Sequence, residues 1–200
     1  MNYFSKSFRI ALFLLLSGYS AYSQSNELYI YGELGGGDGT HGIFKAAMSA
    51  IFCKQNVISL SFYYASHRAP NIPSDYNLNT IFGSFWPQQT VSMFGISYGL
   101  AFFSNNPHIR FIAKGGITEG LVQTAANFIS PSIGAYTYSI ESNMTTGVVL
   151  DPAIEFLLSK GFGFSVGLYA NINAINSVFG IDASMIFRKV RGKSRKHSTH

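Results

Sequence analysis

The sequence predicts an all-β protein: an eight-stranded antiparallel up-and-down transmembrane β-barrel that follows a cleaved signal peptide. The composition is the first reason, because charged residues make up only 12% of the chain beside 18 Phe, 12 Tyr and 20 Gly, whereas globular chains carry ~25% charged residues. The second is an N-terminus typical of export. The third is a series of segments, about ten residues long, in which apolar side chains alternate with small or polar ones.

The predicted signal peptide covers residues 1–23. Lys6 and Arg9 precede an unbroken apolar run over Ile10–Leu16, and Ala21–Ser23 has the small-x-small pattern of a cleavage site. The apolar run is too short to cross a hydrocarbon layer of ~30 Å as a helix. We therefore expect an exported chain that begins near Gln24, with a β-barrel over residues 24–187 and a basic tail over 188–200.

The positive charge is concentrated at the C-terminus. The whole chain carries +5, but residues 24–187 hold 6 basic and 9 acidic residues, a net charge of −3. The high isoelectric point therefore belongs mainly to the tail, and a nucleic-acid partner is not expected. Cys53 is the only cysteine, so the fold has no internal disulfide and must depend on strand pairing and burial.

Eight strands are expected from the alternation and from the turn residues between the segments. The connections alternate in length, as they do between the short periplasmic turns and long outer loops of outer-membrane barrels. Three of the four expected outer connections fit: Gly36–His41, His67–Gln88 and Leu121–Ser142, while Ala174–Asn176 is short. The expected strands are Glu27–Gly35, Gly42–Cys53, Asn56–Ser66, Gln89–Phe103, His108–Gly120, Asn143–Leu158, Phe162–Asn173 and Ser177–Phe187.

The chain resembles small eight-stranded outer-membrane barrels of the OmpA/OmpX kind. The features that carry this resemblance are the export signal, the Asp151–Phe156 strand, the Gly161–Asn173 arm and the aromatic strand end at Phe187. The chain looks most similar to the uncharacterised families described as outer-membrane β-barrel domains. The resemblance implies outer-membrane lipid as surroundings. The residues themselves offer no credible nucleotide loop or metal site, so no cofactor is expected. One difference is that such barrels usually end at the terminal aromatic residue, whereas thirteen residues follow Phe187 here.

Seven charged residues should point away from the apolar strand faces, and so into the lumen. Charge on the lipid face would cost ~2–4 kcal/mol at mid-depth for Arg or Lys. Because both signs are present, we expect a salt-bridged plug; a narrow polar path for a small solute or ion is the alternative. The candidate lumen residues are Glu33, Lys45, Arg110, Lys114, Asp151, Glu155 and Asp182.

The outer loops carry the other candidate site. Aromatic residues near strand ends suit the belts at membrane interfaces, but the Pro70–Pro87 loop could instead contact a surface protein or a glycan. Its candidate contact residues are Tyr76, Phe82, Phe85 and Trp86. The Gly37-x-Gly39-x-x-Gly42 pattern matches a dinucleotide fingerprint, yet a strand rather than a helix should follow it, so we interpret it as a flexible outer loop.

No catalytic constellation and no metal site are predicted. A serine hydrolase acting on outer-membrane lipid would need His41 or His67 beside Asp38 or Asp75 and a serine, and nothing in the sequence fixes that geometry. The leading hypothesis is thus a non-enzymatic outer-membrane barrel with a structural or surface-interaction role. A narrow channel or solute carrier is one alternative. A soluble exported barrel with an apolar interior and an apolar ligand is another, since period-two alternation suits both.

Overall fold

The computed structural model describes residues 28–53, 55–74, 76, 86–106, 108–132, 135–159 and 161–189. The predicted signal peptide over residues 1–23 lies outside these ranges, as do residues 190–200 of the predicted tail. Within the described ranges, no helix is long and apolar enough to cross a membrane.

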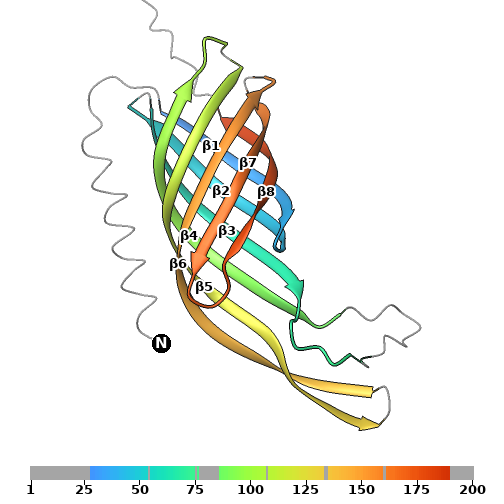
Figure 1. Cartoon of the computed structure of the whole chain (residues 1–200). Helices are drawn as coiled ribbons and strands as arrows, with labels where there is room; N and C mark the ends of the chain where they lie inside the picture. The colour runs from blue at the N-terminus through green and yellow to red at the C-terminus, as the bar shows by residue number, and fades with distance from the viewer. Residues whose placement is uncertain are drawn as a thin grey trace, which may run out of the picture.

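Eight antiparallel strands close into one barrel, so the predicted eight-stranded up-and-down β-barrel is confirmed (Figure 1). Each strand pairs with the next in sequence, and β1 pairs with β8 to complete the ring. The strands are β1 Tyr29–Gly39, β2 Gly42–Phe52, β3 Asn56–Arg68, β4 Gln88–Phe103, β5 Ile109–Ser132, β6 Ala135–Leu157, β7 Phe162–Asn173 and β8 Val178–Lys189.

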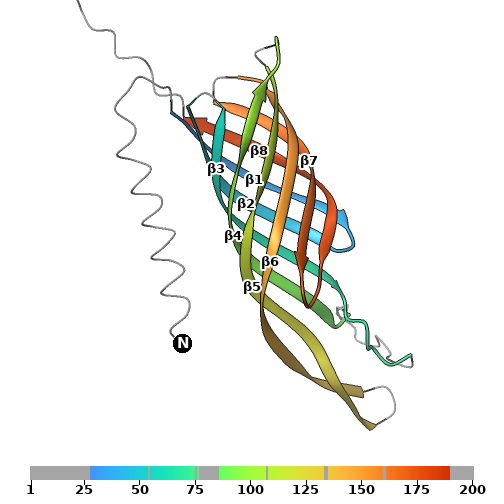
Figure 2. The same cartoon turned by 60° about the vertical axis from the view of Figure 1, so that its left-hand side comes forward.

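The two ends of the barrel differ. The turns after β2, β4 and β6 are short, and β1 begins and β8 ends at the same side (Figures 1 and 2). At the opposite end β5 and β6 run well past their neighbours as a projecting hairpin. We call the first the turn end and the second the outer end, following the expected orientation of such barrels. β8 continues through Arg188 and Lys189, two residues beyond the expected strand end.

Two expected outer connections are strands instead. Leu121–Ser142 was expected to be a loop, but β5 extends to Ser132 and β6 begins at Ala135. The prediction failed because a hairpin beyond the barrel has solvent on both faces, so its strands need no apolar and polar alternation. Gly36–His41 was also expected to be a flexible loop, but β1 continues to Gly39 and only Thr40 and His41 separate it from β2.

The projecting hairpin is bent by a bulge. The register between β5 and β6 shifts between Ala126 and Ile129, and Asn127 has a φ of 54°. Asparagine is among the few residues that tolerate this left-handed conformation. The extra residue breaks the regular ladder and increases the local twist, so the tip of the hairpin leaves the direction of the barrel wall.

Side chains on the barrel wall are apolar outside and polar inside. On β7, Val166 and Leu168 point outward and are 45% and 59% exposed, while Ser165 and Asn171 on the opposite face are buried. β8 repeats the pattern, with Ile181 and Met185 outside and Asp182 inside. This polarity suits a wall surrounded by lipid, and it is opposite to that required by the alternative of a soluble barrel with an apolar interior.

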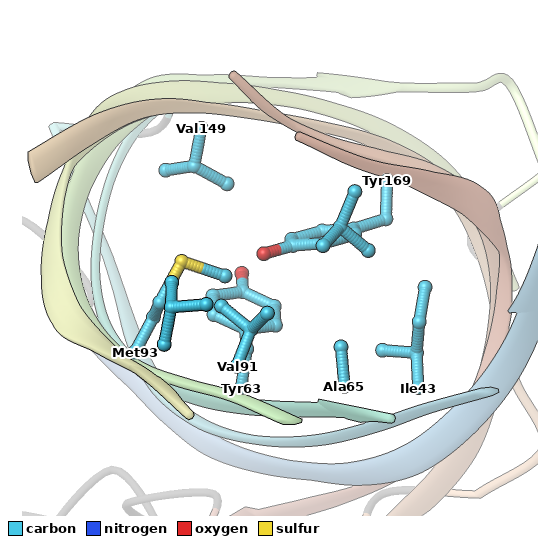
Figure 3. Close-up of a cluster of buried hydrophobic side chains, with 9 residues drawn as sticks. Ile43, Tyr63, Ala65, Val91, Met93, Val149 and Tyr169 are labelled. Atoms are coloured by element: carbon cyan, nitrogen blue, oxygen red, sulfur yellow. The ribbon is translucent and has the colours of Figure 1, made fainter. Parts of the chain in front are cut away.

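Glycines allow the barrel wall to bend sharply at two pairs of neighbouring strands, which we call seams. An ideal Cβ on the inward-facing Gly37 of β1 would lie 2.0 Å from the Ile181 carbonyl oxygen of β8, and one on Gly99 of β4 would lie 1.9 Å from the Ala113 oxygen of β5. The β8–β1 and β4–β5 seams are four strands apart, so they lie on opposite sides of the ring. The section through the barrel is correspondingly flattened (Figure 3).

Candidate functional site

All seven candidate lumen residues lie inside the barrel and are buried, with at most 5% of each residue exposed. They come from five strands: Glu33 from β1, Lys45 from β2, two from β5, two from β6 and Asp182 from β8. Burying a charge is costly unless it is paired and hydrogen-bonded. The pairing of these groups therefore decides whether the lumen is stable.

Lys45 is the centre of the charged cluster. Its ammonium nitrogen lies 2.9 Å from Asp151 Oδ2, 3.2 Å from Asp182 Oδ2 and 3.4 Å from Glu33 Oε2. An ammonium group has three donors, and here each can be directed at a different carboxylate. Lys45 therefore connects β1, β6 and β8 across the lumen to its own strand β2.

Lys114 neutralises two of these carboxylates from the opposite wall. Its Nζ atom lies 3.1 Å from Glu33 Oε1 and 3.2 Å from Asp151 Oδ2. Glu33 and Asp151 thus each lie between two lysines. Ser49 Oγ also donates a hydrogen bond to Glu33 Oε1 at 3.2 Å. Three acidic and two basic side chains form one continuous network across the barrel.

A separate pair lies closer to the turn end. Arg110 of β5 forms a buried salt bridge with Glu155 of β6, and its guanidinium carbon lies 4.7 Å from the centre of the Tyr31 ring. Arg110 faces Glu155 in the β5–β6 register, and Lys114 faces Asp151. Had the register been known, these two opposed pairs could have been deduced from the sequence; alternation alone places them only on the same face.

Apolar layers fill the lumen on both sides of the charged network. Toward the turn end, one cluster contains Tyr31, Ile51, Val57, Ala101, Ile112 and Ile186. Toward the outer end, the other contains Ile43, Tyr63, Ala65, Val91, Met93, Val122, Val149, Tyr169 and Val178 (Figure 3). Each layer draws residues from several strands, so the five-residue network around Lys45 and Lys114 is separated from both barrel ends.

Two tyrosines lie where the outer apolar layer meets the charged network. The rings of Tyr63 and Tyr169 come from different sides of the barrel and their centres are 4.5 Å apart (Figure 3). Tyr63 also donates a hydrogen bond to Asp151 Oδ2 at 3.4 Å. An eight-stranded barrel has an interior that side chains can just fill, and this one is filled by large and paired groups.

Of the four candidate outer-loop residues, Tyr76 and Trp86 are described, while Phe82 and Phe85 lie outside the described residues. Their ring centres are 5.9 Å apart. The Arg68 guanidinium lies 3.5 Å from the centre of the Trp86 ring, a cation–π contact from the end of β3. The structure thus brings together the two candidates it describes and adds a cation to them.

The aromatic contacts continue onto the projecting hairpin. The Tyr76 ring centre is 6.1 Å from that of Phe128 on β5, which is 5.5 Å from that of Tyr138 on β6. Sequence reasoning missed Phe128 because it lay in an expected loop. Its signal was that it is a large aromatic residue followed by Ile129, in a stretch over 121–133 that holds no glycine. We call Arg68, Tyr76, Trp86, Phe128 and Tyr138 the outer aromatic row.

Among the described residues, the structure does not bring His41 or His67 to a carboxylate. His41 and His67 lie side by side, with ring centres 5.2 Å apart, but His41 bonds to Thr40 and Asn176 rather than to an acid. The Asp38 carboxylate accepts a hydrogen bond from the backbone of Gly39, and Asp75 is outside the described residues. In the described part of the chain, no group of three or more His, Cys, Asp or Glu side chains could hold a metal ion.

Comparison with known proteins supports the fold. No protein-family model matches the sequence, and no curated protein matches it. Among solved structures, the N-terminal β-barrel domain of OprF from Pseudomonas aeruginosa superposes with a TM-score of 0.56 at 8% identity, covering 82% of this chain and all of that one. Ail, the attachment invasion locus protein of Yersinia pestis, matches with a TM-score of 0.50 at 13% identity, covering 83% of this chain and all of that one. At such low identity the likeness shows the shared eight-stranded barrel fold alone.

Proposed function

We propose that this protein is a non-enzymatic barrel of the bacterial outer membrane that contacts a surface partner through its outer end. The observation that carries this proposal is the polarity of the wall: apolar side chains cover the outside, and seven charged residues are buried inside. A barrel stable in water would need the reverse arrangement, whereas lipid requires this one. Outer-membrane lipid is therefore its first partner.

The packed lumen favours a structural role over conduction. A solute path would need a continuous hydrated lumen, but the five-residue network around Lys45 lies between two apolar layers. An ion would have to break several buried salt bridges to pass. The charges of both signs that suggested a channel are explained here by their pairing with one another.

The projecting hairpin is the surface best suited to a partner. β4 accompanies β5 only as far as Thr124, and β7 accompanies β6 only from Gly147. Beyond these points, no third strand lies beside either strand among the described residues. The hairpin also presents exposed Ile129, Tyr138 and Ile140. Open strand edges with apolar side chains are places where extended partner segments add, and the aromatic row beside them could also stack on a glycan.

The first test is electrophoresis of protein from the outer-membrane fraction, with and without boiling. A closed barrel keeps its compact form in detergent until heated, so we expect a mobility shift on boiling. Recovery in the soluble fraction without a shift would refute the membrane assignment. Planar-bilayer recordings of the same preparation should show no conductance steps, and discrete steps would instead favour the channel alternative.

The surface role needs its own test. Cells displaying the wild-type protein should bind more of a labelled host-cell extract or glycan panel than cells displaying a variant without residues 126–139, the tip of the hairpin. Equal heat-dependent mobility shifts would show that both barrels are folded. Equal binding by the two would argue against the hairpin as the contact surface and leave the barrel assignment intact.

A further inference from the structure

A chain of hydrogen bonds crosses the outer mouth of the barrel. It begins at His41 in the β1–β2 turn, where Asn176 Nδ2 donates to His41 Nε2 at 3.0 Å. The same Asn176 amide donates to Gln89 Oε1 of β4 at 2.9 Å, and Gln89 Nε2 donates to Thr124 Oγ1 of β5 at 2.9 Å. Because the β4–β5 seam lies opposite the β8–β1 seam, this chain connects the two sides of the rim.

The direction of these bonds fixes the protonation state of His41. Both amide hydrogens of Asn176 are used, one toward Gln89 and one toward His41, so the accepting Nε2 atom carries no proton. The Nδ1 atom lies 2.9 Å from Thr40 Oγ1 and donates to it. Thr40 in turn accepts from the Phe179 backbone N–H at 3.1 Å. With the amides of Asn176 and Gln89 in this orientation, the bridge is therefore complete only when His41 is neutral.

Asn176 cannot easily turn to suit a protonated His41. Its backbone is held from both sides by Asn173, which accepts from the Asn176 N–H at 2.8 Å and donates to the Asn176 carbonyl at 2.7 Å. Turning its amide would direct the oxygen at Gln89 Oε1, so Gln89 would have to turn over as well and Thr124 Oγ1 would have to donate instead of accepting. Unless all three groups reverse together, a proton on Nε2 faces an N–H donor and the contact is lost.

The surroundings of His41 add to this effect. His67 on β3 is the titratable group beside it, with ring centres 5.2 Å apart. From the other packed elements, Thr40, Gln89, Thr124 and Asn176 are uncharged, the Asp38 carboxylate is engaged by the Gly39 N–H, and the Arg68 guanidinium lies over Trp86. Burial, and secondarily the neighbouring His67, lower the pKa of His41 below its usual value.

We propose that His41 and Asn176 form an acid-sensitive latch across the outer mouth, closed when His41 is neutral and released when it is protonated. Release frees the β7–β8 turn from the opposite rim, while the charged network below keeps the lumen closed. The sign follows from linkage: a histidine whose pKa is lowered by folding stabilises the latched state fully above its unfolded pKa of about 6.5 and loses that contribution as the pH falls through the lowered folded value.

The test is a histidine-ring NMR titration of the full mature barrel in phospholipid nanodiscs, from about pH 5 to 8, the range in which a histidine changes charge. His41 is assigned by its absence in His41→Gln. We expect it to titrate below the ordinary histidine value, with faster hydrogen exchange at Ile175 and Asn176 once it is protonated. His108, at the turn end and bonded to the Leu157 carbonyl, serves as an internal reference.

Asn176→Asp reverses the polarity of the latch, because a carboxylate accepts from a protonated imidazole. This variant should raise the pKa of His41 above about 6.5 and leave His108 unchanged. If Asn176→Asp does not fold, Gln89→Leu, which removes the acceptor that orients Asn176, should bring the pKa of His41 back toward the ordinary value. Ordinary titration of His41 in the wild-type protein, or no response of His41 to these variants, would overturn the proposal.

Discussion

Lys45 Nζ and Asp151 Oδ2 lie 2.9 Å apart in the middle of the lumen, joining β2 to β6 across the barrel. Neither β2 nor β6 pairs with the other in the sheet, so this contact adds a connection that the strand ladder does not provide. The salt bridge is surrounded by apolar side chains at both ends. Replacing either residue should therefore leave a buried charge without its partner.

Lys45→Met is expected to lower the free energy of unfolding by about 3–5 kcal/mol, the usual cost of breaking a buried ion pair on one side. Glu33 and Asp151 would then share only Lys114, and Asp182 would lose its salt-bridge partner. Urea unfolding in phospholipid vesicles, followed by tryptophan fluorescence or by the unheated gel band, measures this change. Adding Asp182→Asn should restore part of the loss, since Asp182 makes its salt bridge with Lys45. A single variant as stable as the wild type would contradict the network.

The bent seams give a second prediction. Gly37→Ala would place a Cβ 2.0 Å from a backbone oxygen of β8, whereas a Cβ on Gly32 of the same strand would lie 3.8 Å from its nearest neighbour, the Ala47 oxygen. Backbone atoms of a paired strand cannot move aside cheaply, so Gly37→Ala should destabilise the barrel by several times the effect of Gly32→Ala. The fraction of heat-shifted protein after refolding compares the two. Equal yields would mean that the seam is less tightly bent than described.

The residues that line the lumen could be predicted from the sequence because inward-facing and outward-facing side chains alternate along each strand. A charged residue such as Asp182 lies between Ile181 and Ala183, and a lipid face that excludes charge leaves it only the inner face. The sequence could not predict which lysine pairs with which carboxylate, because the pairing depends on the strand register and on the flattened shape of the barrel. The outer hairpin and Phe128 were missed for the opposite reason: outside the membrane neither face is selected, so alternation gives no signal.

A third prediction compares Tyr63 and Tyr31, which belong to the two apolar layers on either side of the charged network. Tyr63 donates to Asp151 at 3.4 Å, whereas the buried Tyr31 hydroxyl has no hydrogen-bond partner among the described residues and its ring faces Arg110. Tyr63→Phe removes a bond to a charged acceptor and should cost about 1–2 kcal/mol. Tyr31→Phe keeps the ring under Arg110 and should cost less. Urea unfolding of both variants tests the order; a larger loss for Tyr31→Phe would reverse it.

The last prediction concerns the link between the outer loop and the projecting hairpin. The Phe128 ring contacts Tyr76 and Tyr138, while its neighbour Ile129 is 65% exposed. Phe128→Ala should therefore break the outer aromatic row, and Ile129→Ala should not. Limited proteolysis of the barrel in vesicles provides the measurement, because freed loops are cut faster. We expect several-fold faster cleavage in the Phe128 variant alone. The same rate in both would show that the row does not hold the loop against the hairpin, and any surface partner would then meet the two as separate elements.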